Sequence, residues 1–366
     1  MNFPGLDPSW EYSHKVAHCL GLLKTWDLER CQDELRKGVG VLVVANTALG
    51  DTVLCTPLLA ALAENLGRER VGFLVRHPNQ SLYWDSPSVG DVFCVRGKYR
   101  GLGQLKVSLK GTNYRLALVA NCTEPDLIPW LYWCGIRGFL RYRTRWSRFA
   151  SWFANQHEMR RAGESDYATG HAVENNCAMA RALGLTVKEE KIRLHINEQN
   201  PHGDRNPYFI IHPGASRESK CWPLERWAEI ARKVFLSTGW DLVLTGNESE
   251  KALAERLSAL SQSDGVHRVY NYCGELSLRE LAALIRDGRI FLSGDTGPYH
   301  IAVAVGTPTV TLFAPTDRGS SIEACGPRGV DPSRHRVVQT RRVGELISSI
   351  SFSEVWDEVR KVLVWL

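Results

Sequence analysis

Short apolar runs alternate with helix-length segments along most of this chain, and no other feature constrains the fold as strongly. In the first half, the apolar runs predict strands at residues 41–45, 71–76, 92–95 and 116–120. The segments between them predict helices at residues 52–66, 125–134 and 171–183. Strands that alternate with helices in this way indicate a parallel sheet with helices on both faces.

The same alternation starts again after a polar stretch. Residues 188–206 are polar, and Asn-Pro pairs stand at 200–201 and 206–207, so we place a linker at residues 191–207. Beyond it, strands are predicted at 208–212, 241–245, 267–271, 289–293 and 308–313, and helices at 223–238, 249–261 and 277–286. A chain of 366 residues has room for two domains, so we expect Rossmann-like units at 38–190 and 208–345.

Residues 1–37 precede the first strand and predict an N-terminal extension that is helical from about residue 13 to 36. The extension carries no residues with recognisable chemistry. We expect it either to pack on the first domain or to mediate assembly.

Composition excludes several classes of protein. Ten cysteines without a C-x-x-C pair argue against zinc ribbons, iron–sulfur clusters and a dithiol couple, and they are typical of a reducing cytoplasm. No apolar run approaches the roughly 18 residues of a transmembrane helix, and no basic segment precedes an apolar core at the N-terminus. The net charge of +5 is mild, so any cationic surface must be local. We therefore expect a soluble cytoplasmic protein.

The most specific local pattern lies at residues 291–304, FLSGDTGPYHIAVA. An apolar strand ends in Ser-Gly-Asp-Thr-Gly-Pro and passes into a helix of small residues that begins near His300. A helix N-terminus presents unsatisfied N–H groups and a partial positive charge, which suits a phosphate. Asp295 is better placed for sugar hydroxyls, because a carboxylate beside phosphate is repelled; alternatively it caps its own helix, and His300 packs beneath the turn.

Two further turns accompany this pattern. After the strand at 208–212 comes His-Pro-Gly-Ala-Ser, then Lys220 in a loop and Pro223 at a helix start, so Lys220 could meet a diphosphate or could be a surface lysine. After the strand at 41–45 comes Ala-Leu-Gly-Asp, which places Asp51 at the carboxyl end of a parallel strand, where ligands bind. An isolated Asp at this point is also a common N-cap.

These motifs, in this order, resemble glycosyltransferase family 9, the ADP-heptose:lipopolysaccharide heptosyltransferases. The resemblance covers residues 38–315, and it includes Leu244-Thr245-Gly246 and the run Ala304-Val305-Gly306-Thr307-Pro308. It implies an α/β fold of the GT-B type, with two Rossmann-like domains whose parallel sheets face each other across a cleft. The first domain would bind the acceptor and the second the nucleotide sugar. The C-terminal helix, within 346–366, would pack back on the first domain.

The resemblance implies an inverting, metal-independent transfer of heptose from ADP-heptose to a hydroxyl of the lipopolysaccharide inner core. Asp51 would be the catalytic base, and burial would raise its pKa. No Asp-x-Asp ends a strand, so neither a metal nor another cofactor is expected. The resemblance places nucleoside contacts near Thr245, where Glu248 or Glu250 would hold the ribose. The residues assigned to the donor are His212, Gly214, Ala215, Ser216, Lys220, Thr245, Gly246, Glu248, Glu250, Asp295, Thr296, Gly297 and His300.

The acceptor is expected to be an anionic glycolipid that carries Kdo carboxylates or phosphates. The candidates for its contacts are Gly50, Thr52, Arg76 and Arg137. Residues 130–161 hold seven arginines and nine aromatic residues with a single acid, which suits the inner face of a membrane, although core packing of the aromatics explains the pattern equally well. No nucleic-acid motif is present.

Three alternatives stay open at this stage. The sugar could go to a protein or a small molecule, because Asn46-Thr47-Ala48 stands where family members often carry a basic residue. The donor could be a UDP-sugar, as in an N-acetylglucosamine transferase or epimerase of the same fold. The chain could also be a non-catalytic scaffold, against which Asp51, Lys220 and Asp295 together argue.

Overall fold

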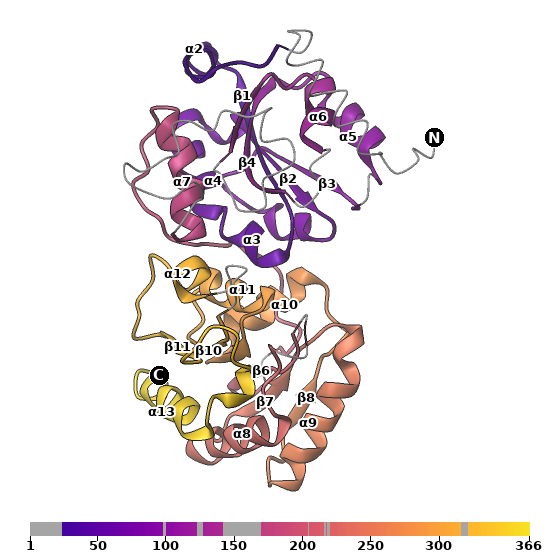
Figure 1. The fold of residues 1–366 in the computed structure, drawn as a ribbon. Coiled ribbons are helices and arrows are strands. Elements are labelled where there is room, and N and C mark those ends of the chain that lie inside the picture. Colours follow the sequence, from indigo (N-terminus) through magenta and orange to yellow (C-terminus); the bar gives the residue numbers. More distant parts are fainter. Residues whose placement is uncertain are drawn as a thin grey trace. The chain divides into compact units, whose positions relative to one another are not determined.

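The computed structural model describes residues 24–97, 100–122, 127–141, 170–203, 205–215, 217, 220–315 and 321–366. The chain divides into two compact units, Met1–Lys191 and Ile192–Leu366 (Figure 1). Each unit is built on a parallel sheet with helices, which confirms the α/β class and the two Rossmann-like domains.

The first unit has a five-stranded sheet in the order β3-β2-β1-β4-β5, with every neighbouring pair parallel. Its strands are β1 (Gly40–Asn46), β2 (Val71–Arg76), β3 (Asp91–Val95), β4 (Tyr114–Cys122) and β5 (Gly138–Arg141). All seven residues of β1 are buried, because helices cover a parallel sheet on both faces. The chain order reverses between β1 and β4, and ligands of such sheets bind at the carboxyl ends of the two strands that meet there.

The single helix predicted at 52–66 is two helices in the structure. A short helix, α3 (Leu49–Val53), ends before α4 (Thr56–Leu66), which carries Pro57 in its first turn. Proline has no N–H to donate and is tolerated only at a helix start, so the chain restarts its helix at this point. The other α-helices of this unit are α2 (Leu28–Arg36), α5 (Leu102–Leu109), α6 (Leu127–Trp133) and α7 (Ala172–Ala182).

Part of the predicted N-terminal extension is described, while residues 1–23 lie outside the described ranges. Helix α2 starts after Asp27, whose side chain accepts a hydrogen bond from the Arg30 N–H. Trp26 pairs with Gly138 at the first residue of β5. A Cβ on Gly138 would lie 2.7 Å from Cys31 Sγ, so glycine is what allows α2 to approach the sheet this closely.

The second unit has a six-stranded parallel sheet in the order β11-β10-β9-β6-β7-β8, whose chain order reverses between β6 and β9. Its strands are β6 (Tyr208–His212), β7 (Asp241–Leu244), β8 (Val269–Asn271), β9 (Phe291–Gly294), β10 (Thr309–Phe313) and β11 (His335–Gln339). Its α-helices are α8 (Leu224–Thr238), α9 (Lys251–Ser263), α10 (Leu278–Asp287), α11 (Gly297–Val305), α12 (Ile322–Cys325) and α13 (Phe352–Leu363). Pro223, predicted as the first helical residue of α8, is its N-cap.

The C-terminal helix packs on the second unit, which corrects the prediction that it packs back on the first. The buried face of α13, at Val355, Val359 and Val362, belongs to the core that also includes α8, β9 and β10. The turn before it is held by Trp222, whose indole N–H donates to Ile350 O at 2.9 Å, and by Arg226. Apolar residues on one face of the helix therefore complete this domain's own core.

The polar stretch predicted as the linker is anchored along the second unit. The N–H of Leu194 donates to Ala304 O at 3.0 Å, and the guanidinium of Arg286 donates to Ile196 O at 2.7 Å. Arg279 forms an ion pair with Glu198 at 2.9 Å. Within the described ranges, no helix is both long enough and apolar enough to cross a bilayer.

Candidate active site

The second domain gathers its predicted donor residues where the strand order reverses. His212 ends β6 and is paired in register with Ser293 of β9, so the loops after the two strands start side by side. One loop leads to Lys220 and α8, and the other leads through Asp295 to α11. The sheet topology therefore places the two motifs side by side at the carboxyl ends of β6 and β9.

The N-terminus of α11 follows β9 after two residues, and Thr296 is its N-cap. The Thr296 side chain makes no capping hydrogen bond, and its Oγ1 is buried without a hydrogen-bond partner among the described residues. A buried hydroxyl without a partner costs free energy that an anionic ligand at the helix terminus could recover.

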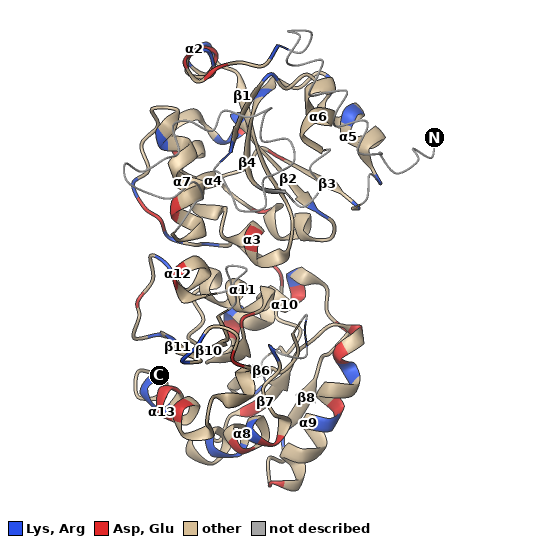
Figure 2. Cartoon of the chain, in the orientation of Figure 1, with Lys and Arg blue, Asp and Glu red and all other residues tan. Residues whose placement is uncertain are grey.

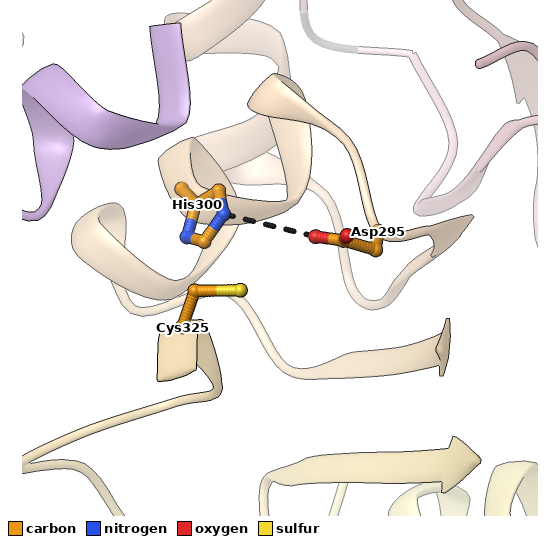
Figure 3. Close-up of side chains that lie close together, drawn as sticks. All are labelled: Asp295, His300 and Cys325. Atoms are coloured by element: carbon orange, nitrogen blue, oxygen red, sulfur yellow. Dashed lines mark ion pairs between the residues drawn. The ribbon is translucent and has the colours of Figure 1, made fainter. Parts of the chain in front are cut away.

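Lys220, Asp295 and His300 form one network. Nζ of Lys220 donates to Asp295 Oδ2 at 2.8 Å, and these side chains are 17% and 10% exposed. His300 Nε2, on α11, lies 4.0 Å from the other carboxylate oxygen of Asp295 (Figure 3). The ammonium offsets the carboxylate charge, so an anionic diphosphate meets less repulsion here than a bare Asp would create.

His212 and Thr245 are buried at the end of the sheet. His212 Nδ1 and Thr245 Oγ1 are 3.1 Å apart. Burial lowers the pKa of His212, and the nearby Glu250 carboxylate opposes that shift only in part. His212 is therefore neutral at pH 7 and acts as a hydrogen-bonding partner of Thr245, away from solvent.

The glycines of the two loops let Glu250 lie between them. A Cβ on Gly214 would lie 2.2 Å from Glu250 Oε1, and one on Gly246 would lie 2.3 Å from Cys273 Sγ and 3.1 Å from Glu250 Oε2. Glu250 also accepts a hydrogen bond from the Asn247 N–H at 2.8 Å. The backbone and this carboxylate thus approach too closely for any larger residue at either glycine.

The structure separates the two acids between which the sequence left the ribose contact open. Glu250 is half-buried and faces the Gly214 loop, whereas Glu248 is exposed and packs its carboxylate against Gly274. Glu250 is therefore the acid that shares the site with the His212 loop. Of the other predicted donor residues, Ala215 is half-buried in that loop and Ser216 lies outside the described residues.

In the first domain, Asp51 follows β1 at the point where that sheet's order reverses. It is the only charged residue of α3, which Figure 2 shows as a red segment. The N-cap of α3 is Ala48, so Asp51 lies in the first turn and is not the cap. The hydroxyl of Thr47 donates to Asp51 Oδ2 at 2.9 Å and orients the half-buried carboxylate.

Gly50 and Thr52, which the sequence assigned to the acceptor, lie on the packed side of α3. Both residues are buried, and Thr52 is 0% exposed. The Thr52 hydroxyl accepts a hydrogen bond from Tyr83 OH at 2.7 Å and donates to Leu49 O at 2.8 Å. Consecutive residues of a helix point in different directions, so Gly50 and Thr52 can pack inward while the carboxylate of Asp51 between them is only half-buried.

The two arginines predicted for the acceptor lie at opposite ends of the strands of the first sheet. Arg76 is exposed at the carboxyl end of β2, on the same edge as Asp51. Arg137 precedes β5 at the amino edge, where its guanidinium donates to Tyr132 O at 2.7 Å and Ile136 O at 2.9 Å. This position does not support the assignment of Arg137 to the acceptor, because ligands of a parallel sheet bind at the carboxyl ends of its strands.

Sequence reasoning missed two polar residues at the carboxyl ends of the strands in the first sheet. Thr47 could have been recognised as a hydroxyl four residues before Asp51. Arg141, at the carboxyl end of β5, is buried at 9% exposure, and only knowledge of that strand would have singled it out. Most of the cationic-aromatic segment, from residue 142 to residue 161, lies outside the described ranges.

The aromatic residues of this segment that the structure describes are mainly part of the core. Trp130 packs against the core of the first domain and donates its indole N–H to Leu102 O at 3.2 Å. Tyr132 and Phe139 are buried, whereas Trp133 is 55% exposed. For this part of the segment, core packing accounts for the aromatic residues other than Trp133.

The chain is similar in sequence to known proteins. The chain is 25% identical over 288 residues to lipopolysaccharide heptosyltransferase 3 of Escherichia coli K12, which covers 73% of this chain and 80% of that protein. Over 153 residues, 41% of each chain, it is 32% identical to lipopolysaccharide heptosyltransferase 1 of Pseudomonas aeruginosa.

Solved structures show the same fold. The ADP-heptose lps heptosyltransferase II of E. coli superposes with a TM-score of 0.70 at 19% identity, over 89% of this chain and 99% of that one. The E. coli heptosyltransferase WaaC with ADP gives 0.68 at 20% identity, over 88% and 99%. The sequence model of glycosyltransferase family 9 (heptosyltransferase) matches residues 104–329, more than half of the chain. This protein is therefore a glycosyltransferase and belongs to glycosyltransferase family 9.

Proposed function

We propose that this enzyme transfers heptose from ADP-heptose to a hydroxyl of the lipopolysaccharide inner core, with inversion at the anomeric carbon. The observation that carries the proposal is the Lys220–Asp295–His300 network beside the N-terminus of α11. The relatives named as lipopolysaccharide heptosyltransferases support the sugar and the acceptor class. We place the reaction at the cytoplasmic face of the membrane, where such an acceptor would be presented.

The second domain would bind the donor. The diphosphate would lie at the N-terminus of α11, where backbone N–H groups and the Thr296 hydroxyl can donate to its oxygens. Lys220 would add its positive charge as the bond between the anomeric carbon and the phosphate oxygen breaks. Asp295 would accept hydrogen bonds from sugar hydroxyls while Lys220 keeps its charge balanced. Glu250 would contact the ribose from its position beside Gly214.

The first domain would bind the acceptor and supply the base. Asp51 would take the proton from the acceptor hydroxyl as its oxygen attacks the anomeric carbon from the face opposite the diphosphate. The electron pair of the broken bond would leave with ADP, and the attack from the opposite face would invert the configuration. Thr47 would hold the carboxylate in position for this proton transfer through its hydrogen bond to Oδ2.

We further propose that the transfer needs no metal or other cofactor. The ammonium of Lys220 and the partial charge of the α11 terminus would stabilise the leaving diphosphate in place of a metal. Arg76, exposed at the carboxyl edge of the first sheet, would bind an anionic group of the glycolipid acceptor. Nucleic acid has no role in this reaction.

The test is binding and transfer with purified full-length protein. Calorimetry with ADP-heptose, ADP, UDP-N-acetylglucosamine and GDP-mannose, with chelator and then with Mg²⁺, should show selective binding of ADP-heptose in chelator. Transfer to a Kdo-containing lipid acceptor should follow, and Asp51→Asn should bind the donor but not transfer. Preference for a uridine donor would replace this proposal with a UDP-sugar enzyme, and absence of any nucleotide binding would replace it with a scaffold.

A further inference from the structure

Asp295, His300 and Cys325 converge from three segments of the second domain. Asp295 follows β9, His300 lies on α11, and Cys325 ends the short helix α12 (Figure 3). One donor atom from each, a carboxylate oxygen, an imidazole nitrogen and a thiol sulfur, lies within 4.8 Å of the other two. We propose that these residues form a binding site for a transition-metal ion of the zinc class, and that the site is inhibitory.

The donor set selects the class of ion. Thiolate and imidazole ligands suit zinc, whereas magnesium and calcium prefer oxygen alone. Zinc bonds of about 2.0–2.3 Å place the ligand atoms of a tetrahedral site roughly 3.4 Å apart, so the longest separation must close by about 1.4 Å. Side-chain rotation can supply that movement. Three protein ligands leave the fourth position for water.

The burial of the cluster favours binding. His300 is 5% exposed, and the Asp295 side chain is 10% exposed, so an ion here is largely removed from bulk water. Tyr299 is fully buried, and its hydroxyl has no hydrogen-bond partner among the described residues. The ring centroids of Tyr299 and His300 are 4.8 Å apart. The Tyr299 hydroxyl could therefore become an outer partner of the ligand set when an ion draws the ligands together.

The charges account for an inhibitory site. Lys220 holds Asp295 Oδ2, so an ion would take Oδ1, the oxygen that faces His300. Coordination by Cys325 releases the thiol proton to solvent, and the thiolate offsets part of the metal charge. The bound ion would then occupy the carboxylate that we assign to the sugar. This competition rests on the proposed function, whereas metal binding itself does not.

Cobalt is the probe for the site, because a cobalt–thiolate bond gives a charge-transfer absorption that zinc lacks. Chelator-stripped full-length protein should bind one equivalent of Co²⁺ with that absorption and with the d–d intensity of a tetrahedral ion, and Zn²⁺ should displace it. Cys325→Ser should lose the charge-transfer band. Tyr299→Phe should weaken Co²⁺ binding by about tenfold, the range for outer partners of metal ligands.

The matched control is Cys221→Ser, a half-buried cysteine next to Lys220 in the chain and outside the cluster. It should keep the wild-type absorption and affinity. The proposal fails if wild type shows no stoichiometric thiolate band, if Cys325→Ser keeps it, or if Cys221→Ser loses it. A urea midpoint equal to wild type will show that Cys325→Ser is folded.

A competition experiment separates this proposal from the proposed function. ADP-heptose should raise the apparent Kd for Co²⁺, and Zn²⁺ should inhibit transfer by wild type more strongly than by Cys325→Ser, whose basal activity should be unchanged. A thiolate band that is indifferent to ADP-heptose would retain the metal site and count against the donor assignment. Binding of ADP-heptose without a thiolate band would reject the metal site and leave the proposed function intact.

Discussion

The ammonium of Lys220 lies 2.8 Å from the carboxylate of Asp295, although 75 residues separate them in the chain. Both side chains are mostly buried, at 17% and 10% exposure. Removing one partner of such a pair leaves the other charge in a poorly hydrated place, which costs more than the pair itself contributes. The two residues should therefore act as a unit in donor binding.

Lys220→Met should lower kcat/KM for the donor by about 10²–10³-fold, the range for loss of one donor to a developing anion. Asp295→Asn should also impair the enzyme, and the double variant should lose much less than the product of the two single effects. Steady-state kinetics of the four proteins measures this coupling. Lys251→Met, at the start of α9, is the control for loss of a lysine. Multiplicative effects would show that the pair is incidental to donor binding.

Asp51→Asn should reduce kcat by about 10²–10⁴-fold, since general-base catalysis contributes roughly that factor. Binding of ADP should stay within error of wild type, because we propose that the second domain binds the nucleotide. Thr47→Val removes only the hydrogen bond that orients the carboxylate, so it should give a smaller loss in kcat with the same KM. Steady-state kinetics and calorimetry on the two variants test whether Asp51→Asn loses more kcat than Thr47→Val. Equal losses in kcat and in ADP affinity would contradict the assignment of Asp51 as base.

Thr52→Val should destabilise the protein without changing the KM for the acceptor. The substitution keeps the shape of the side chain but leaves the buried Tyr83 hydroxyl without its 2.7 Å partner, at a cost of about 1–3 kcal/mol. Tyr83→Phe removes the other member, so the double variant should be more stable than the sum of the two single effects predicts. Urea unfolding of the wild type, the two single variants and the double variant measures these free energies. A raised acceptor KM in Thr52→Val would restore the sequence-based assignment of this residue.

The parts of the fold that the sequence predicted are those in which local pattern and burial agree. β1 and β6 are central strands buried on both faces, so they read as continuous apolar runs. β5 and β11 are the outermost strands of their sheets and carry Arg141, His335 and Arg336. Because these residues interrupt the apolar runs, the sequence did not predict either strand. A short strand that includes charged residues shows no clear alternation of apolar and polar residues by which it could be recognised.

The same limit applies to the site. The motif around Thr296 is contiguous, and the strand–turn–helix that it encodes is enough to predict an anion site. The pairing of Lys220 with Asp295 depends on two loops meeting at the reversal of the sheet, which no local pattern reports. Arg137 was assigned to the acceptor without knowledge of β5, and without that strand the end of the sheet at which Arg137 lies could not be known.

Stability should fall as the pH drops below about 6.5, the ordinary pKa of histidine in an unfolded chain. His202 is 1% exposed, and its Nδ1 lies 3.1 Å from Tyr272 OH. Burial lowers the pKa of His202, and the Arg205 guanidinium lowers it further, against the smaller opposing effect of Asp241. The pKa of His212 is lowered by burial in the same way. The unfolded chain therefore binds more protons than the folded one in this range, so acid favours unfolding.

The measurement is the urea midpoint of wild type and His202→Gln between pH 7.5 and pH 5. Wild type should keep its stability above the unfolded pKa and lose it progressively below, and His202→Gln should show a shallower slope because one of the two groups no longer titrates. His195→Gln replaces an exposed histidine of the same unit and is the control for the substitution itself. Wild-type stability that rises on acidification would mean that His202 is held in its charged form by the folded protein.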